Sequence, residues 1–372
     1  MLRPLLVAFW FSLLFLPFRG LQASLILFVI LLCSFILFRY LGTPLRSVLS
    51  TIQPFGKKLY TLGIALSRLR CSRYCALLIL TGLPFVLENY ILDISILTGI
   101  YAILAIGLNV VVGFSGLLNL GYVAFYAIGA YTYALLYAKM GLGFWASVPL
   151  CIGLTTFSGF VLSVPALRLK GDYLAIVSLG FGEIVRLILN NWDSLTNGPN
   201  GISRIPTPSV LGFSLGGLNR YYYLILLSVI LTYVVVKRVR FSRIGRAWMA
   251  IREDEICASS MGIHTTRYKL YAFSFGSLWA GLAGALFAAK MQFVSPESFT
   301  FMESVLILCM VILGGIGSLP GVVAGAFILI MLPEVLREVQ SYRMLALGSG
   351  LILMMVFRPQ GLLGGPGSGS NE

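Results

Sequence analysis

The chain has 372 residues, of which 58% are hydrophobic and 11% charged, and its formal net charge is +14. A soluble protein of this length cannot hide so much apolar surface, so the composition excludes a soluble globular protein. The basic excess does not indicate a nucleic-acid partner, because the Lys and Arg residues lie between apolar runs, as in cytoplasmic loops of membrane proteins.

Apolar runs of membrane-spanning length follow one another along the chain. The first resembles a signal peptide, but no small-residue cleavage site follows it, so we expect it to be retained. The sequence predicts an all-α polytopic membrane protein, a multi-span helical bundle of about 10–12 hydrophobic segments, of which the shorter ones can be re-entrant. The expected segments are 4–18, 21–41, 75–95, 97–113, 117–138, 144–167, 172–192, 220–237, 268–290, 303–317, 320–335 and 343–357.

Three parts are expected along the chain. Residues 1–75 form an N-terminal hydrophobic hairpin with a basic loop, residues 76–363 a transmembrane domain, and residues 364–372 a disordered tail rich in Gly and Ser. The connections 42–74 and 237–252 are strongly basic, which predicts that both are cytoplasmic. Six expected spans separate them, so the polar loop 193–219 belongs on the outer face.

Polar side chains interrupt the expected spans at two places. The stretch 107–131 carries amides and hydroxyls that can bind a passing solute or a neighbouring helix, and chemistry alone favours the helix. Glu183 and Arg186 are one helical turn apart, so they can pair as part of a pathway or gate, or as a structural pair near a helix end. The candidates in the first stretch are Asn109, Asn119, Tyr122 and Tyr126.

The stretch 242–262 gathers charges in an apolar chain. We expect one amphipathic helix that is capped by Ser242 and ends at Gly262. It is either a surface helix beside the bilayer or a docking helix for a cytoplasmic partner. Its expected apolar side holds Ile244, Trp248, Ile251, Ala258 and Met261, and its middle holds Arg252, Glu253, Asp254 and Glu255.

Small residues recur every four positions in two later stretches, which predicts close helix packing in the bundle interior, either static or sliding. The second stretch also contains Gly314, Gly315 and Pro320, which favour a broken or re-entrant helix. The first row is Gly276, Ala280, Gly284 and Ala288, with Ser277, Gly281, Ala285 and Ala289 beside it, and the second row is Gly317, Gly321 and Gly325.

No catalytic or metal site is expected, because the chain has a single histidine, His264, and dispersed acids. It contains no GxxxxGK[ST] phosphate-binding loop, so an ATP-driven motor would have to be a separate chain and this chain would bind no cofactor.

Seven stretches in order resemble one family: GLNVVVGFSGLLNLGY, RLKGDYLAIVSLGFGEIVR, NGPNGIS, GRAWMAIREDEICASSMGI, KMQFVSPESFTFMES, VILGGIGSLPGVVAGA and FRPQGLL. The family is that of the permease subunits of bacterial high-affinity branched-chain amino-acid ABC importers, and the resemblance, over about residues 93–363, is closest to the LivM type. It implies a multi-pass protein of the bacterial plasma membrane. The implied partners are a second permease of the LivH type, two cytoplasmic ABC ATPases and a periplasmic amino-acid-binding protein.

The resemblance also implies a coupling helix that contacts an ATPase near an EAA-x3-G pattern. The aligned residues here are Ile256, Cys257 and Ala258, followed by Gly262. Only the Ala and the Gly match, so we expect the acidic contact to pass to Glu253, Asp254 or Glu255. The binding protein is expected to dock over loops such as 193–219.

Three alternatives compete with an amino-acid permease. The nearest is a urea or short-amide permease subunit of the same superfamily, although the GGIGSLPG run resembles the amino-acid branch more closely. A passive channel would need no coupling helix. An integral-membrane enzyme would need clustered His, Asp or Glu, which the sequence does not offer.

Overall fold

The computed structural model describes residues 88–166, 171–210 and 213–335, together with Thr81, Gly82, Pro84, Leu169, Gly348, Gly361 and Leu362. The chain divides into two units, Met1–Leu80 and Thr81–Glu372, and every described residue belongs to the second. The expected spans 4–18 and 21–41, the basic loop 42–74 and the tail 364–372 lie outside the described residues, and so does the expected span 343–357 apart from Gly348.

The first long helix of the bundle is α3 (Asn89–Asn109), which continues as the π-helix η1 (Val110–Phe114). Two expected spans, 75–95 and 97–113, are therefore wrong in this region, because a single helix runs through the expected gap. Residues 94–98 contain neither glycine nor proline, so nothing there interrupts the helical hydrogen bonds. Since two of the six spans expected between the basic loops are replaced by one helix, the prediction that both loops lie on the same side no longer follows from the number of spans.

Three long helices follow along the chain. They are α4 (Tyr122–Met140), α5 (Phe144–Ala166) and α6 (Asp172–Asn191), and α6 leads into the short helices α7 (Asp193–Thr196) and η2 (Gly198–Asn200). Gly141 ends α4 with φ +65°, the left-handed conformation that glycine adopts without a steric penalty. The remaining elements are β1 (Ile202–Ser203), β2 (Ser209–Val210), β3 (Phe213–Ser214), α8 (Leu218–Arg240), α9 (Arg243–Glu253), α10 (Glu255–Ser260), α11 (Thr265–Met291), β4 (Phe293–Val294), η3 (Pro296–Phe299), α12 (Phe301–Gly314) and α13 (Leu319–Val335).

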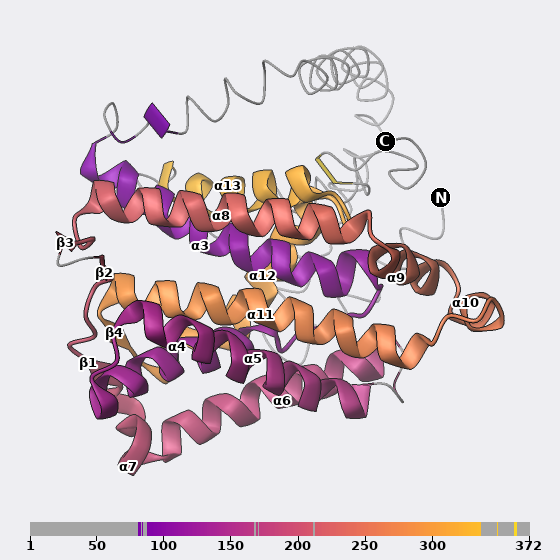
Figure 1. Ribbon diagram of the computed structural model, residues 1–372, viewed down its shortest axis with the longest axis horizontal. Helices are drawn as coiled ribbons and strands as arrows, with labels where there is room; N and C mark the ends of the chain where they lie inside the picture. The colour runs from indigo at the N-terminus through magenta and orange to yellow at the C-terminus, as the bar shows by residue number, and fades with distance from the viewer. Residues whose placement is uncertain are drawn as a thin grey trace, which may run out of the picture. The chain divides into compact units, whose positions relative to one another are not determined.

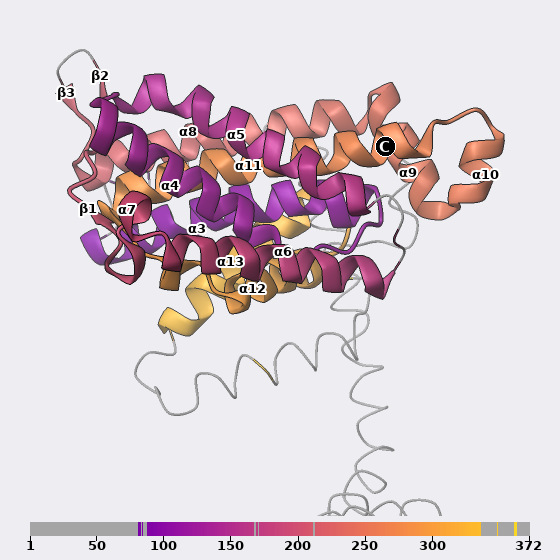
Figure 2. The same cartoon turned by 90° about the horizontal axis from the view of Figure 1, so that it is seen from below.

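The helices run back and forth between two ends of the bundle (Figures 1 and 2). One end, which we call the α10 end, holds α9 and α10; the other, the β1 end, holds α7 and the four short strands. There β1 pairs with β4, and β2 with β3, both antiparallel. Helix α11 packs against α3, α4 and α5, while α3 also contacts α8, α12 and α13. The core therefore lies around α3 and α11.

Helices α12 and α13 are joined by a sharp turn, as the Gly/Pro break predicted. Gly315 and Gly317 have φ of +106° and +87°, which side chains with a Cβ rarely adopt. Gly317 thus lies in the turn. The prediction that Gly317, Gly321 and Gly325 form one row on a single helix is therefore wrong for Gly317, whereas Gly321 and Gly325 both lie on α13. The 14-residue α12 spans only about 21 Å.

Among the described residues, four helices are long and apolar enough to cross a membrane: Asn89–Phe114, Phe144–Pro165, Leu218–Arg240 and Thr265–Met291. Together with the shorter apolar helices Phe301–Gly314 and Leu319–Met331, they confirm the predicted all-α polytopic fold.

Candidate functional site

Two buried asparagines have unused hydrogen-bonding capacity. The Oδ1 of Asn109, the last residue of α3, accepts from the backbone N–H of Gly317 at 2.9 Å. The Oδ1 of Asn119 accepts from Gly121 N at 3.0 Å, in the turn before α4. Within the described part of the chain, neither Nδ2 has a hydrogen-bond partner. Each amide therefore keeps its donors free inside the bundle.

Two of the five tyrosines of α4, Tyr122 and Tyr126, differ in the use of their hydroxyls. Tyr122 is fully buried and donates to the Gly276 carbonyl of α11 at 2.8 Å. Tyr126 is 1% exposed, and its hydroxyl has no hydrogen-bond partner among the described residues. Tyr122 thus ties α4 to α11, whereas Tyr126 places an unpaired polar atom in the interior.

Glu183 and Arg186 form the ion pair that their spacing predicts. Arg186 Nε donates to Glu183 Oε2 at 2.9 Å, and Nη2 lies 2.8 Å from the same oxygen. Their side chains are 35% (Arg186) and 32% (Glu183) exposed, and the pair lies in the middle of α6 rather than near its end. A pair this exposed contributes little to stability.

The expected single helix over 242–262 is wrong, because the chain forms α9 and α10 with a break at Asp254. This residue has φ −156° and ψ 114°, and its carboxylate accepts from Ile256 N at 2.8 Å and Cys257 N at 2.9 Å. An Asp side chain satisfies the free N–H groups at a helix start, so it favours a new N-terminus over continuation. Ser242 and Gly262, at φ +83°, bound the two-helix segment as expected.

The expected apolar side of this segment is only partly correct. Trp248, Ile251 and Ala258 are at most 5% exposed, so they face the bundle. Ile244 and Met261 are 39% and 84% exposed. The break at Asp254 turns α10 relative to α9. The spacing of apolar residues along one straight helix therefore does not predict which residues after Asp254 face the bundle.

Arg252 joins the α9–α10 junction to η1. Its Nη1 donates to the Gly113 carbonyl at 2.6 Å. In a π-helix the regular i→i−4 hydrogen bonds are interrupted, which leaves carbonyl groups to bond elsewhere. The turn between α12 and α13 is close by, since a Cβ on Gly317 would lie 3.3 Å from Arg252 Nη1. One guanidinium therefore lies where α9, η1 and the α12–α13 turn meet.

Glu255 pairs with Lys269, a lysine near the start of α11. Lys269 Nζ lies 2.6 Å from Glu255 Oε1, and the side chains of the two residues are 5% and 30% exposed. A lysine this buried requires an anionic partner. Two of the charges in the α9–α10 segment, Arg252 and Glu255, are thus directed into the protein.

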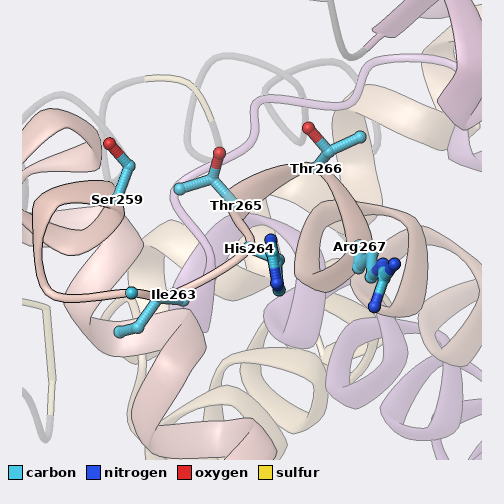
Figure 3. Close-up of a pocket in the computed structure, with 7 residues that line it drawn as sticks. Ser259, Ile263, His264, Thr265, Thr266 and Arg267 are labelled. Atoms are coloured by element: carbon cyan, nitrogen blue, oxygen red, sulfur yellow. The ribbon is translucent and has the colours of Figure 1, made fainter.

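Two depressions adjoin this segment. A cleft of about 150 Å³ is lined by Ser115, Gly116, Arg252, Glu255 and Lys269, among others. The second lies at the turn from α10 to α11 and is lined by residues 259 and 262–267 (Figure 3). There the hydroxyls of Ser259, Thr265 and Thr266 point one way, and His264 and Arg267 the other. The turn offers an open polar surface rather than an enclosed ligand site.

The glycines of α11 lie at its contacts with α3 and α4. A Cβ on Gly276 would lie 3.1 Å from the Gly107 carbonyl oxygen of α3, and one on Gly284 would lie 2.6 Å from the Ala130 nitrogen of α4. Ala280, between them, is fully buried. On α13, Gly321 and Gly325 lie against Gly314 of α12. These helix backbones approach closely because no side chain separates them.

Comparisons with known proteins point to one family. A family model described as the branched-chain amino acid transport system / permease component matches residues 90–357. The chain belongs to this family. Permease protein LivM of the high-affinity branched-chain amino acid transport system of Salmonella typhimurium is 48% identical over 77% of this chain and 73% of its own length. LivM of Escherichia coli is also 48% identical, and LivH of E. coli is 28% identical over 72% of this chain and 92% of its own length. No solved structure matches significantly.

The permease is therefore an integral membrane protein, and its relatives are transport subunits rather than enzymes. Sequence reasoning missed three of its polar residues. Lys269 was overlooked because its partner is 14 positions away. Tyr101 and Glu303, whose side chains share a hydrogen bond, are 202 positions apart. A signal for Glu303 was present, since it is the only charge in the apolar run 301–314.

Proposed function

We propose that this permease is a translocating subunit of an ATP-driven importer for leucine, isoleucine and valine in the bacterial inner membrane. The observation that carries the proposal is the 48% identity to two LivM permeases over 77% of the chain. In this proposal residues 76–363 form the transport domain. A LivH-type permease completes the path, two ABC ATPases hydrolyse ATP, and a periplasmic protein delivers the amino acid.

The α9–α10 segment is the proposed contact for the ATPase. Ile256 and Met261 expose 72% and 84% of their surface at the tip of the α10 end, and large exposed apolar side chains favour a binding surface. Of the three candidate acids, Asp254 caps α10 and Glu255 pairs with Lys269. Glu253 is exposed, and no ion pair holds it within the described residues. We therefore assign the acidic contact to Glu253.

Motion of the ATPase would reach the bundle through Arg252 and Glu255. Arg252 bonds to η1 beside the α12–α13 turn, and Glu255 bonds to α11, the helix packed against α3, α4 and α5. A displacement of α10 therefore acts on both halves of the core. ATP can drive reorientation only to the extent that the ATPases bind it differently in the two conformations.

The substrate path is proposed to run along the polar residues of the interior. Asn109, Asn119 and Tyr126 have donors without partners in the described residues, so they can bind a solute without losing a protein contact. Tyr122 donates to Gly276 and would have to break that bond. Glu183 and Arg186 remain candidates for a gate on α6. Delivery over loop 193–219 is supported by its place at the β1 end, opposite α10 (Figure 1).

Reconstitution tests the transport proposal. Vesicles that contain this permease, its LivH-type partner, the two ATPases and the binding protein should accumulate labelled leucine when ATP is supplied. Leucine accumulation without ATP would contradict the importer. Accumulation of urea with leucine excluded would favour the urea permease, a reading to which the relatives lend no support.

Charge reversal tests the coupling contact. Glu253→Lys should weaken copurification of the ATPases and lower leucine uptake about tenfold or more, because an interfacial charge pair becomes a repulsion. The matched control is Glu88→Lys, an exposed residue before α3 at the β1 end, which should leave ATPase copurification unchanged. Equal copurification in both variants would contradict the assignment.

A further inference from the structure

A carboxyl group lies where α3, α4 and α12 meet. Tyr101 on α3 donates its hydroxyl hydrogen bond to Glu303 Oε2 at 2.6 Å. The next residue, Ser304, accepts from the backbone N–H of Val123 at 3.0 Å, which holds the start of α12 against the start of α4. Glu303 is thereby positioned by contacts from two other helices.

The depth of this carboxyl group in the membrane is unusual for a charged residue. Tyr101 lies halfway along the 26-residue helix Asn89–Phe114, and so does the carboxyl that it binds. An ionisable side chain far from both ends of a spanning helix is expensive, and such residues mark ion or substrate sites. Among the described residues, no Lys, Arg or His forms an ion pair with Glu303.

Tyr126 supplies a second polar group beside this carboxyl. Its ring packs against that of Phe299, which lies four residues before Glu303 along the chain. The residue is 1% exposed, and its hydroxyl has no hydrogen-bond partner in the described part of the chain. A buried hydroxyl without a partner lowers stability, and a bound solute with an acceptor oxygen would supply the missing partner.

Aromatic rings border the same group of residues. The Tyr126 ring lies 5.3 Å from that of Phe287 and 5.1 Å from that of Phe299, measured between centroids. Glu303 itself is partly exposed and follows Met302, which is 70% exposed. The carboxyl group can therefore be reached from the side of α12, while the aromatic residues lie deeper.

We propose that Glu303 binds the α-ammonium group of the transported amino acid midway across the membrane, with Tyr126 as donor to its carboxylate. The inference rests on the proposed function and adds a substrate site to it. An ammonium group offers three donors to the carboxylate, and a free phenol hydroxyl can donate to an anionic oxygen.

Uptake by the complete importer in vesicles tests the site. Glu303→Gln should lower ATP-driven leucine uptake about tenfold or more, because a charge-assisted hydrogen bond to the ammonium is lost. ATP hydrolysis stimulated by the loaded binding protein should persist. The matched control is Glu297→Gln in η3, which removes the same charge from an exposed position six residues earlier and should leave uptake unchanged.

A second variant keeps the proposal testable if Glu303→Gln fails to fold. Tyr126→Phe removes a hydroxyl that no described residue binds, so its melting midpoint should be equal to or above the wild-type value. Leucine uptake should nevertheless fall about threefold or more. A purely structural role for Tyr126 would move stability and uptake together.

The outcomes separate this proposal from the one on which it rests. Wild-type vesicles that do not import leucine would overturn both. Wild-type import with equal uptake in the Glu303→Gln and Glu297→Gln vesicles would overturn the ammonium site alone. Loss of the second permease from a well-folded Glu303→Gln preparation would also overturn it, since Glu303 would then pair with that subunit.

Discussion

At the scale of single residues, the charges of the α9–α10 segment are divided between the protein and its surroundings. Arg252 and Glu255 contact η1 and Lys269, whereas Glu253 extends into solvent. The pair Glu255–Lys269 is asymmetric, because the lysine is almost completely buried and the glutamate is not. Removing one member should therefore differ in effect from removing the other.

We predict that Glu255→Gln destabilises the permease more than Lys269→Met does. The first change leaves a buried cation without a negative charge beside it, at a cost of about 3 kcal/mol, while the second leaves a carboxylate that water can reach, at about 1 kcal/mol. Thermal unfolding of the two purified variants in detergent measures the order. The opposite order would mean that Lys269 has another anionic partner.

At the scale of elements, small residues set the distance between helices. Gly284 of α11 lies against the backbone of α4 near Ala130, while Gly153 of α5 has no atom within 4 Å of the position that a Cβ would take. Glycine thus serves close packing at position 284 and has no such role at position 153.

Alanine substitution at these two glycines should give opposite results. Gly284→Ala forces α11 and α4 apart and should cost about 1–3 kcal/mol. Gly153→Ala meets no neighbour and should stabilise α5 by up to about 1 kcal/mol, because alanine is the better helix former. The melting midpoints of the two variants, compared with the wild-type value, measure these effects. An unchanged midpoint for Gly284→Ala would contradict the prediction, because the α11–α4 contact could then widen without loss of stability.

At the scale of the whole molecule, the bundle has two chemically different ends. Basic residues of α8 and α9 gather with α10 at one end, and the polar loop 193–219 lies at the other (Figures 1 and 2). Lys and Arg are retained on the cytoplasmic side during insertion, so the α10 end should be cytoplasmic.

Thiol labelling tests this orientation. In a variant that keeps only the exposed Cys257 of α10, a membrane-impermeant reagent should label inside-out vesicles and spare right-side-out ones. Asn200→Cys in a cysteine-free background places the thiol in η2, exposed at the β1 end, and should give the reverse pattern. Labelling of both variants from the same side would contradict the orientation.

Composition and local spacing predicted the class of fold, most helices and several details of their ends. Apolar runs of spanning length were sufficient for the bundle, and Gly315 and Gly317 for the break between α12 and α13, because these effects act within a few residues of chain. The pair Glu183–Arg186 was predictable for the same reason, since three positions along a helix fix the distance between side chains.

Only the tertiary structure decided which polar groups have partners. Asp254 could continue a helix or start a new one, and packing of Trp248, Ile251 and Ala258 against the bundle selects the break. Tyr101 and Glu303 meet because α3 and α12 pack together across 202 positions of chain, a contact that no local pattern encodes. The sequence by itself thus determined the membrane-spanning elements through local physics, while the candidate substrate site depends on how distant helices pack.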